Sequence, residues 1–205
     1  MKTINNYITE KLKISKPSKV NIKHTLFPND RYELKDMILD EIAKNGKTCS
    51  LNHIDVSHVK TMEYLFLQVD FDGDISHWDV SNVTNMAQMF ASSNFEGDIS
   101  GWDVSNVQTM GRMFTLTNFN GDIGDWDVSN VVNMSGMFLE SKFNQNISKW
   151  DVSNVIFIDE MFRLAEFNQD ISNWNLSSVK NYLDMFSGCK INKKYKPFIN
   201  GKRIE

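Results

Sequence analysis

Residues 119–138, FNGDIGDWDVSNVVNMSGMF, decide the fold because close copies of this stretch recur along the chain at a constant step. The five tryptophans all keep a step of 24 residues, at positions 78, 102, 126, 150 and 174. Upstream, HIDVSHV at 53–59 is the same segment with Ile54 in the tryptophan position, which makes six copies. A fixed period of about 20–50 residues is the sequence signature of repeat architectures. The chain is therefore predicted to form six coils.

The columns that recur in every coil are mostly apolar. In one coil they are Phe71, Ile75, Trp78, Val80, Val83, Met86, Met89 and Phe90. The spacing from Val83 to Phe90 predicts one or two turns of helix in each coil, after a short strand-like segment. A unit of this size cannot bury its apolar face alone, whereas stacked units bury it against their neighbours. We interpret the aromatic and methionine columns as the core ladders of a solenoid, with an aromatic cofactor box as the alternative.

Polar columns repeat beside the apolar ones. Serine recurs at 57, 81, 105, 129, 153 and 177, and aspartate at 79, 103, 127 and 151. Both residue types accept hydrogen bonds from nearby backbone N–H groups, so they are expected to cap turns. Carboxylates stacked about 5 Å apart, the spacing of neighbouring strands, would repel one another unless they are hydrogen-bonded, hydrated or metal-bound.

The two ends of the chain depart from the repeat. Residues 28–46 predict a helix, since Asp30 and Glu33 have the spacing of a capping box and Gly46 is a C-terminal stop. A second short amphipathic helix is predicted near the N-terminus from Ile4, Tyr7, Ile8 and Leu12. The expected organisation is a basic segment with a short helix, a capping helix, a six-coil solenoid and a basic C-terminal cap or tail, at residues 1–26, 27–50, 51–190 and 191–205.

Charge is distributed unevenly along the 205 residues, whose net charge is -4. Residues 51–186 carry 6 Lys and Arg against 19 Asp and Glu, net -13, whereas residues 1–50 are net +4 and residues 187–205 are net +5. An acidic body repels phosphate, which argues against a nucleic-acid partner. No apolar run approaches the roughly 18 residues of a membrane span, so membrane insertion is not expected.

The acidic body is predicted to be a recognition surface for a basic protein partner. The basic ends, 1–23 and 190–203, offer a partner within the protein itself, so self-assembly through these ends and the acidic body is a second hypothesis. In a third interpretation the carboxylates only keep a Phe- and Met-rich solenoid soluble.

Two groups of residues have the composition of a metal site. Asp70, Asp72 and Asp74 alternate around Gly73 like a fragment of a calcium loop, although the distal glutamate of an EF-hand is missing. His53 and His77 occupy one column in adjacent coils, as a transition-metal pair would. A turn motif and two exposed variable residues are the competing interpretations. The sequence is therefore predicted to hold no metal or other cofactor, with calcium as the alternative.

Nothing in the sequence predicts catalysis. No histidine recurs beside a serine in a triad-like pattern, and Cys49 and Cys189 have no paired histidine. The protein is expected to be non-enzymatic, with no catalytic residue.

Function is assigned to the columns that vary, because the constant columns are committed to stacking. These are the position before each tryptophan and two adjacent positions on the helix-like segment. The predicted binding surface consists of His77, Arg112, Asp125, Lys149, Asp159 and Glu160. Apolar residues in neighbouring variable positions are interpreted as anchors for a partner or as capping contacts, namely Leu116, Leu139, Phe157 and Leu164.

The repeated unit WDVSNVxxMxxMF, together with CSLNHIDVS at 49–57, resembles the repeat of a bacterial surface-protein family that includes mycoplasma repeat lipoproteins and proteins related to BspA-type leucine-rich repeats. The resemblance implies a leucine-rich-repeat-like solenoid with a role in adhesion, surface display or protein binding, and it carries no catalytic residues. The predicted fold is thus an α/β repeat, a right-handed solenoid of six 24-residue coils with a helical N-terminal cap.

Location stays open at this point. The resemblance implies the bacterial cell surface or secretion, whereas the N-terminus lacks the uninterrupted apolar stretch of a secretory signal peptide, which favours a cytoplasmic or virion-associated protein. The opening INNYITEKLKISK is also similar to openings of gut Bacteroidales proteins and their phages. A structural or assembly role, such as that of a bacteriophage virion component, is therefore the alternative to a binding module.

Overall fold

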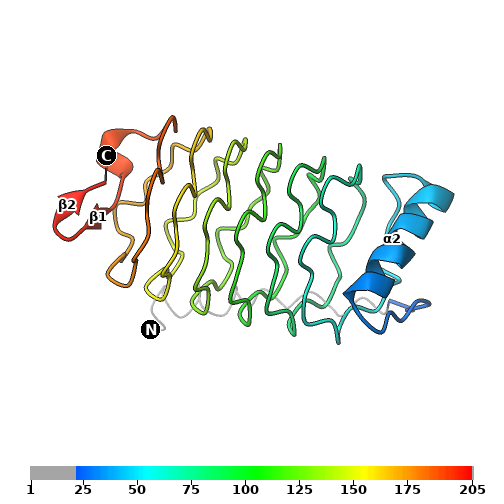
Figure 1. Cartoon of the computed structure of the whole chain (residues 1–205). Helices are drawn as coiled ribbons and strands as arrows, with labels where there is room; N and C mark the ends of the chain where they lie inside the picture. Colours follow the sequence, from blue (N-terminus) through cyan, green and yellow to red (C-terminus); the bar gives the residue numbers. More distant parts are fainter. Residues whose placement is uncertain (1–21, 205) are drawn as a thin grey trace, which may run out of the picture.

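The computed structural model describes residues 22–204, so the helix predicted from Ile4, Tyr7, Ile8 and Leu12 lies outside the described residues. Successive turns of chain stack along one axis, with a helix at one end and a small hairpin at the other (Figure 1). The regular elements are the helix α2 (Arg31–Asn45), the 3-10 helix η1 (Lys193–Tyr195), and the strands β1 (Phe198–Ile199) and β2 (Lys202–Arg203).

Parallel backbone pairing joins each turn of chain to the next. Bridges with a step of 24 residues run in one unbroken row through Thr61, Asn85, Thr109, Asn133, Phe157 and Asn181. Along this row, alternate N–H groups donate to the following coil: Met86 to the Thr109 carbonyl at 3.0 Å, and Gln88 to the Gly111 carbonyl at 2.9 Å. A further parallel bridge, between Leu26 and Ile54, adds the segment before α2 to the stack.

The prediction of one or two helical turns in each coil is wrong. The segment from Val83 to Phe90 forms consecutive tight turns, in which Met89 N–H bonds the Met86 carbonyl at 3.2 Å. In every coil one residue of this segment is left-handed, with φ between 54° and 60°, namely Tyr64, Gln88, Arg112, Gly136, Glu160 and Asp184. A left-handed residue ends a helix, and here it directs alternate N–H groups toward the next coil. Apolar residues three or four apart fit both geometries, which explains the error.

A second left-handed row follows four residues later, at Gln68, Ser92, Leu116, Glu140, Leu164 and Gly188. Nearly all of these residues carry a Cβ, which costs roughly 1–2 kcal/mol each in this conformation. The bonds between coils must offset that cost.

Aromatic side chains fill the interior as parallel stacks. Phe138 lies between Phe114 and Phe162, with ring centroids 5.8 and 5.7 Å away, and its ring is nearly parallel to both. The tryptophans line a neighbouring part of the core and are 4% exposed. Trp126 donates its indole N–H to the Ile99 carbonyl of the preceding coil at 3.2 Å, and the other four tryptophans make the equivalent bond. The tryptophan column therefore provides both apolar burial and a polar link between coils.

The aspartate column caps turns through hydrogen bonds. Asp127 Oδ1 accepts from the N–H of Ser129 at 3.1 Å and from its hydroxyl at 2.6 Å. These bonds hold the pKa of Asp127 below its ordinary value, although the neighbouring carboxylate of Asp151 acts in the opposite direction. The pKa of Asp151 is lowered in the same way by Ser153. The carboxylates of Asp127 and Asp151 are thus stabilised in the ionised form by bonds within each turn.

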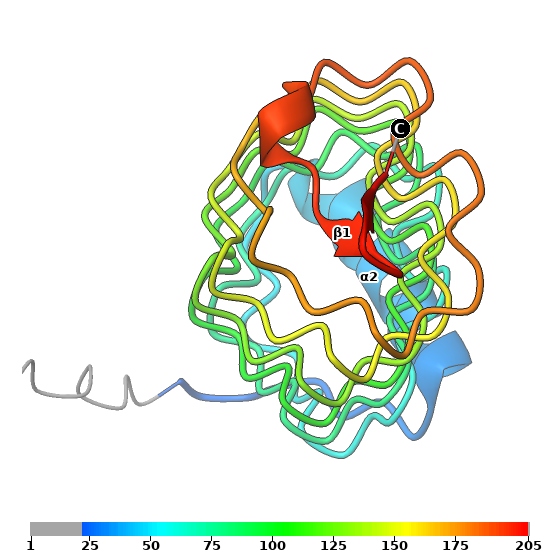
Figure 2. The same cartoon turned by 90° about the vertical axis from the view of Figure 1, so that its left-hand side faces the viewer.

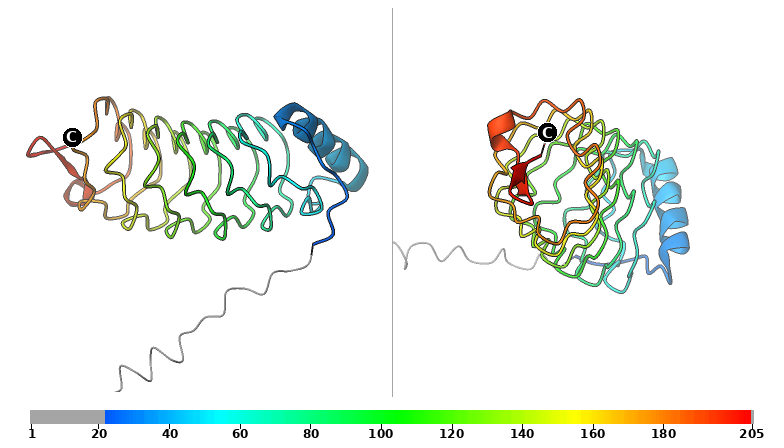
Figure 3. Two further views of the ribbon diagram at one scale, coloured as in Figure 1. Left: turned by 90° about the horizontal axis from the view of Figure 1, so that it is seen from below. Right: turned by 60° about the vertical axis from the view of Figure 1, so that its left-hand side comes forward.

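Helix α2 begins and ends where its sequence predicts. The Asp30 carboxylate accepts from the N–H groups of Tyr32 and Glu33, and Gly46 ends the helix with φ of 86°. Glu33 does not close the expected capping box on Asp30, because its carboxylate instead accepts from the backbone N–H of Asn29 at 2.7 Å. The helix lies across the first coil at one end of the stack (Figure 3).

The C-terminal segment folds back over the last coil. Strands β1 and β2 pair through Phe198 with Arg203, and the Asn200–Gly201 turn between them has positive φ at both residues. Figure 2 shows this hairpin inside the outline of the last coil. Ile191 and Ile204 are buried there, so the segment covers apolar core that the last coil would otherwise expose.

Replacing Trp126 with alanine is expected to lower the free energy of unfolding by about 3–5 kcal/mol, the range for truncating a large buried aromatic residue. Trp126→Phe should cost less, because it keeps most of the apolar surface and loses mainly the bond to the Ile99 carbonyl. Urea unfolding measures both variants. A loss below about 1 kcal/mol for Trp126→Ala would show that the column is not core.

The aspartate column predicts acid sensitivity. A carboxyl group whose pKa is lower in the folded than in the unfolded state stabilises the fold at neutral pH, and this contribution disappears as pH falls through the folded-state pKa. The double variant Asp127→Asn/Asp151→Asn should therefore lose less stability than the unaltered chain between about pH 7 and pH 3. Asn175 already caps the same turn in the last coil, accepting from Ser177 N–H at 3.1 Å, so the substitution preserves the turn. Urea unfolding at each pH measures the free energy of unfolding of both chains. If this free energy falls equally with pH in the variant and in the unaltered chain, the account is wrong.

Candidate functional site

The tight-turn segments of successive coils form one continuous wall of the stack, which we call the turn face and define by residues 61–68 and their equivalents at steps of 24. Arg112 lies on this face and reaches across one whole coil to Glu160, with 3.0 Å between Nη2 and Oε2. The other carboxylate oxygen of Glu160 contacts Arg163 Nη1 at 2.8 Å. This carboxylate is therefore shared by two guanidinium groups from different coils.

Gly136 makes the contact between these coils possible. It occupies the row position between Arg112 and Glu160 and has φ of 60°. A Cβ at this position would lie 3.0 Å from Arg112 Cγ, tighter than an ordinary van der Waals contact. The missing side chain leaves the space that the arginine crosses.

The predicted binding surface divides into separate groups. Arg112 and Glu160 are in direct contact, and beside them Asp159 accepts a hydrogen bond from the Ser135 hydroxyl at 2.7 Å. Asp125 and Lys149 form a second, exposed pair at 2.7 Å, and the Asp125 hydrogen bond raises the pKa of Lys149. Exposed ion pairs of this kind contribute little to stability, so both side chains are available to a partner.

His77 is set apart from these groups. Its backbone N–H donates to the Asn52 side chain at 3.0 Å, and its Nδ1 is 3.0 Å from the Ser76 hydroxyl. The structure thus places it in a local network with the preceding coil, and no described contact joins it to Arg112 or Glu160.

Large apolar side chains are exposed among the charged residues. Leu116 and Leu164 are 51% and 50% exposed and share one row of the turn face, with Glu140 between them. Phe157 is also exposed, at 43%, where other coils have asparagine or threonine. Leu139, expected to be a variable surface residue, is instead buried. Exposed apolar groups beside charged groups are typical of protein-binding surfaces.

The calcium candidates are each engaged by protein groups. Asp70 contacts Lys47 Nζ at 3.0 Å, Asp72 accepts from the Glu96 N–H at 2.9 Å, and Asp74 accepts from the Asn52 amide at 2.6 Å. The three carboxylates therefore bind to three different neighbours. This arrangement fits the turn-motif interpretation.

The two histidines of the transition-metal candidate contact different residues. His53 Nε2 lies 3.4 Å from the carboxylate of Glu41 on α2, whereas His77 contacts Ser76. Within residues 22–204, no group of three or more His, Cys, Asp and Glu side chains is arranged to hold a metal ion.

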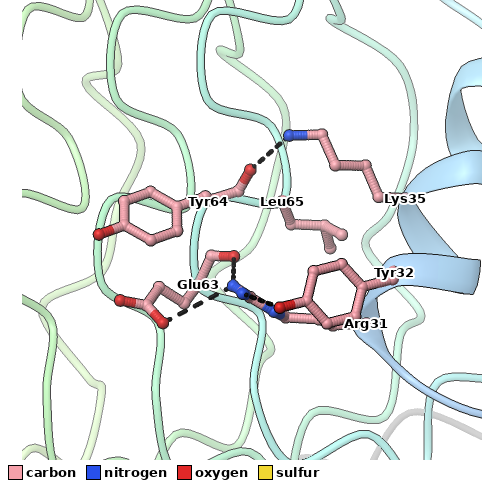
Figure 4. A pocket seen from close by; sticks show the side chains of 6 residues that line it. All are labelled: Arg31, Tyr32, Lys35, Glu63, Tyr64 and Leu65. Atoms are coloured by element: carbon pink, nitrogen blue, oxygen red, sulfur yellow. Dashed lines mark hydrogen bonds and ion pairs between the residues drawn. The ribbon is translucent and has the colours of Figure 1, made fainter.

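A pocket that the sequence did not indicate lies between α2 and the first coil (Figure 4). Its volume is about 230 Å³, and its walls are Arg31, Tyr32, Lys35, Glu63, Tyr64 and Leu65. Arg31 Nη1 donates to the Glu63 carbonyl at 2.8 Å, and Lys35 Nζ donates to the Tyr64 carbonyl at 2.9 Å. The sequence signal for this pocket was the pair Arg31 and Lys35, two cations four residues apart on one face of the helix. The groups that they bind are backbone carbonyls, which residue types do not reveal. The contacts attach α2 to the stack.

The positive φ of Gly136 predicts that the fold is sensitive to a side chain at this position. Gly136→Ala should destabilise the fold by about 1–2 kcal/mol, because alanine is disfavoured at positive φ and its Cβ would displace Arg112. Gly101→Ala is the matched control, since a Cβ there meets nothing within 4 Å. Urea unfolding compares the two variants, and equal effects would contradict the proposed role of Gly136.

Among residues 22–204, no helix is both long enough and apolar enough to cross a lipid bilayer. Neither a comparison with curated proteins nor one with solved structures finds a match. One family matches, described as "Mycoplasma protein of unknown function, DUF285", over residues 33–142 and again over residues 93–198. The two matches overlap and together cover most of the 205 residues, from Glu33 in α2 through all six coils. The chain therefore belongs to this DUF285 family of mycoplasma-type proteins.

Proposed function

We propose that the chain is a non-enzymatic protein-binding module of the adhesion or surface-interaction type. In this proposal it is built as a right-handed, leucine-rich-repeat-like solenoid related to the BspA-type repeats. Membership of a mycoplasma-type family is consistent with the proposal, and the unbroken row of parallel bridges at steps of 24 residues supports the solenoid.

The proposal rests on a difference between the constant and the variable columns: the side chains of the constant columns hold the coils together, and those of the variable columns change from coil to coil. The recurring polar side chains are used within the stack: the Asn130 amide, for example, donates to the Ser105 carbonyl of the preceding coil at 2.8 Å, and Asp127 caps its own turn. The recurring apolar side chains are buried. The constant aspartates are also exposed, but their hydrogen bonds are made within the stack. The variable columns therefore supply the exposed groups that differ from coil to coil, and the stack holds them at a regular spacing. Such a surface can display a recognition pattern without a catalytic centre.

Charge indicates the class of partner. Four of the 6 Lys and Arg in residues 51–186 are held in ion pairs, namely Arg112, Lys142, Lys149 and Arg163. The net charge of this region is -13, and most of its few cations already contact carboxylates. A field of this sign accelerates encounter with basic proteins and is screened over about 8 Å at physiological salt. We therefore propose a basic protein surface as the partner, with Leu116 and Leu164 as apolar anchors.

Photo-crosslinking from the turn face tests this function. A chain that carries a benzophenone amino acid at position 116 or 164 is mixed with a cell extract and irradiated. It should become crosslinked to a discrete basic protein, which mass spectrometry identifies. The purified partner should then bind the chain with an association rate that falls steeply as salt rises. The variant Leu116→Ser/Leu164→Ser should weaken binding at least tenfold, because two anchors are lost.

The matched control is Leu39→Gln, which removes an exposed apolar side chain of α2, outside the turn face, while leaving the anchors in place. This control should bind within about twofold of the unaltered chain, because Leu39 does not belong to the proposed recognition surface. If both variants bind equally well, the turn face is not the recognition surface. If association does not depend on salt, a basic partner is ruled out.

A further inference from the structure

The stack has two chemically different ends. Between coils, alternate N–H groups of the turn face donate to the coil that follows, as Glu160 does to Leu183 and Phe162 does to Met185, both at 2.9 Å. The last coil has no following coil. Within residues 22–204, its four equivalent N–H groups have no acceptor, and they belong to Tyr182, Asp184, Phe186 and Gly188. These four groups, the donor edge, alternate along one segment as in a strand that lacks its partner.

The opposite end presents acceptors, the carbonyls of Thr61, Glu63, Leu65 and Leu67, at the positions that accept from the preceding coil elsewhere in the stack. Helix α2 lies against this end, where Arg31 donates to the Glu63 carbonyl and Lys35 donates to the neighbouring Tyr64 carbonyl. A second copy of the chain therefore cannot dock its first coil on the donor edge unless α2 is displaced. Two donor edges are poorly matched, since each presents four N–H groups while the carbonyls of Tyr182, Asp184 and Phe186 accept from N–H groups of their own coil. The donor edge is thus unsuited to a second copy.

Two hollows that share Tyr182 and Ile204 lie beside the donor edge, and together we call them the groove. One, of about 380 Å³, is lined by Tyr182, Leu183, Asp184, Met185, Ser187 and Ile204. The other, of about 870 Å³, is lined by Tyr182 and by Ile199, Asn200, Lys202, Arg203 and Ile204 of the hairpin region. Leu183 is 70% exposed and Tyr182 is 40% exposed, so the groove offers apolar contact beside the N–H groups. Phe186 is a buried residue, and an unpaired N–H in such surroundings is costly.

The surroundings of the groove are strongly basic. Residues 176–204 carry seven Lys and Arg against one acidic residue, Asp184. Lys180 precedes the donor edge and is exposed, and Lys202 is exposed and lines the wider hollow. This end of the molecule therefore attracts negative charge, in contrast to the acidic body.

We propose that the donor edge binds an acidic peptide in extended conformation. The peptide would add to the last coil as each coil adds to the one before it, with alternate carbonyls accepting from Tyr182, Asp184, Phe186 and Gly188. Its acidic side chains would face Lys180 and Lys202, and its apolar side chains would contact Tyr182 and Leu183. Strand addition of this kind takes affinity from main-chain bonds and specificity from side-chain contacts. The donor edge lies in the last coil's part of the turn face, but it binds through backbone N–H groups at the end of the stack and does not use the anchors Leu116 and Leu164, so it goes beyond the proposed function.

Amide hydrogen exchange of the full chain tests the pairing directly. The probe is a fluorescein-labelled ten-residue peptide of alternating valine and aspartate, added in excess after its affinity has been measured by fluorescence anisotropy. The four donor-edge amides should exchange at least tenfold more slowly with the peptide bound, because each gains an acceptor. The amides of Ile158, Glu160, Phe162 and Leu164 are the internal reference, since they already donate to the last coil and should not change.

Charge variants test the choice of partner. Lys180→Glu/Lys202→Glu should weaken binding about fivefold or more. Lys60→Glu is the matched control, because residue 60 occupies the same column as residue 180 at the opposite end of the stack, and its binding should be unchanged.

Three results would overturn the proposal. The first is failure of the valine–aspartate peptide to bind, or binding without slower exchange at the donor edge. The second is equal binding of a valine–lysine peptide. The third is equal competition by a single-stranded oligonucleotide of the same charge, which would identify a general polyanion site in place of a peptide site. Failure of a basic protein to bind through Leu116 and Leu164 would leave these measurements unaffected, because the peptide pairs with backbone N–H groups of the last coil. The two proposals can therefore fail separately.

Discussion

The structure depends on one constraint: alternate backbone N–H groups of each coil must meet carbonyls of the next coil, as Met86 meets the carbonyl of Thr109. Every coil must then have the same length and the same turn geometry, or the row of bridges from Thr61 to Asn181 would be interrupted. The same constraint explains the two left-handed residues in each coil, since they turn the peptide groups out of the coil's own path. The left-handed residues cost free energy, but a row of unpaired backbone N–H and C=O groups would cost more.

Satisfying this constraint leaves the chain little freedom in its repeated positions. The tryptophans must be large enough to fill the core and must carry an N–H that reaches the preceding coil, as Trp126 does to Ile99. The stacked aspartates accept hydrogen bonds from the serine two residues later, as Asp127 does from Ser129. Diversity is then confined to the columns that face solvent. There a single missing side chain, at Gly136, is enough to let Arg112 join a carboxylate two repeats away.

Polarity is the other consequence. Alternate N–H groups of the turn face donate to the following coil, although other N–H groups, such as that of Lys180, donate to the preceding coil. The turn face therefore has an acceptor end and a donor end, and the two ends are covered differently. Cationic side chains of α2 supply donors to the acceptor end. At the donor end, the C-terminal hairpin covers apolar core around Ile191 and Ile204 but leaves a groove beside Tyr182. The basic charge at this end and the acidic charge of the body give the molecule two surfaces suited to opposite partners.

The amino-acid sequence by itself determined the period, the core columns and the span of α2, because these depend on spacing and on residue type. It also indicated the uneven charge and placed Arg112, Asp159 and Glu160 in adjacent variable columns. The tertiary structure alone decided that the segment after Val83 forms tight turns, since apolar spacing is the same in a helix and nearly all the left-handed residues carry a Cβ. Only the folded chain showed Arg112 beside Glu160, Arg31 beside the Glu63 carbonyl, and the unpaired N–H groups of the last coil. Each of these depends on which backbone atoms of distant coils meet, and residue types do not record that information.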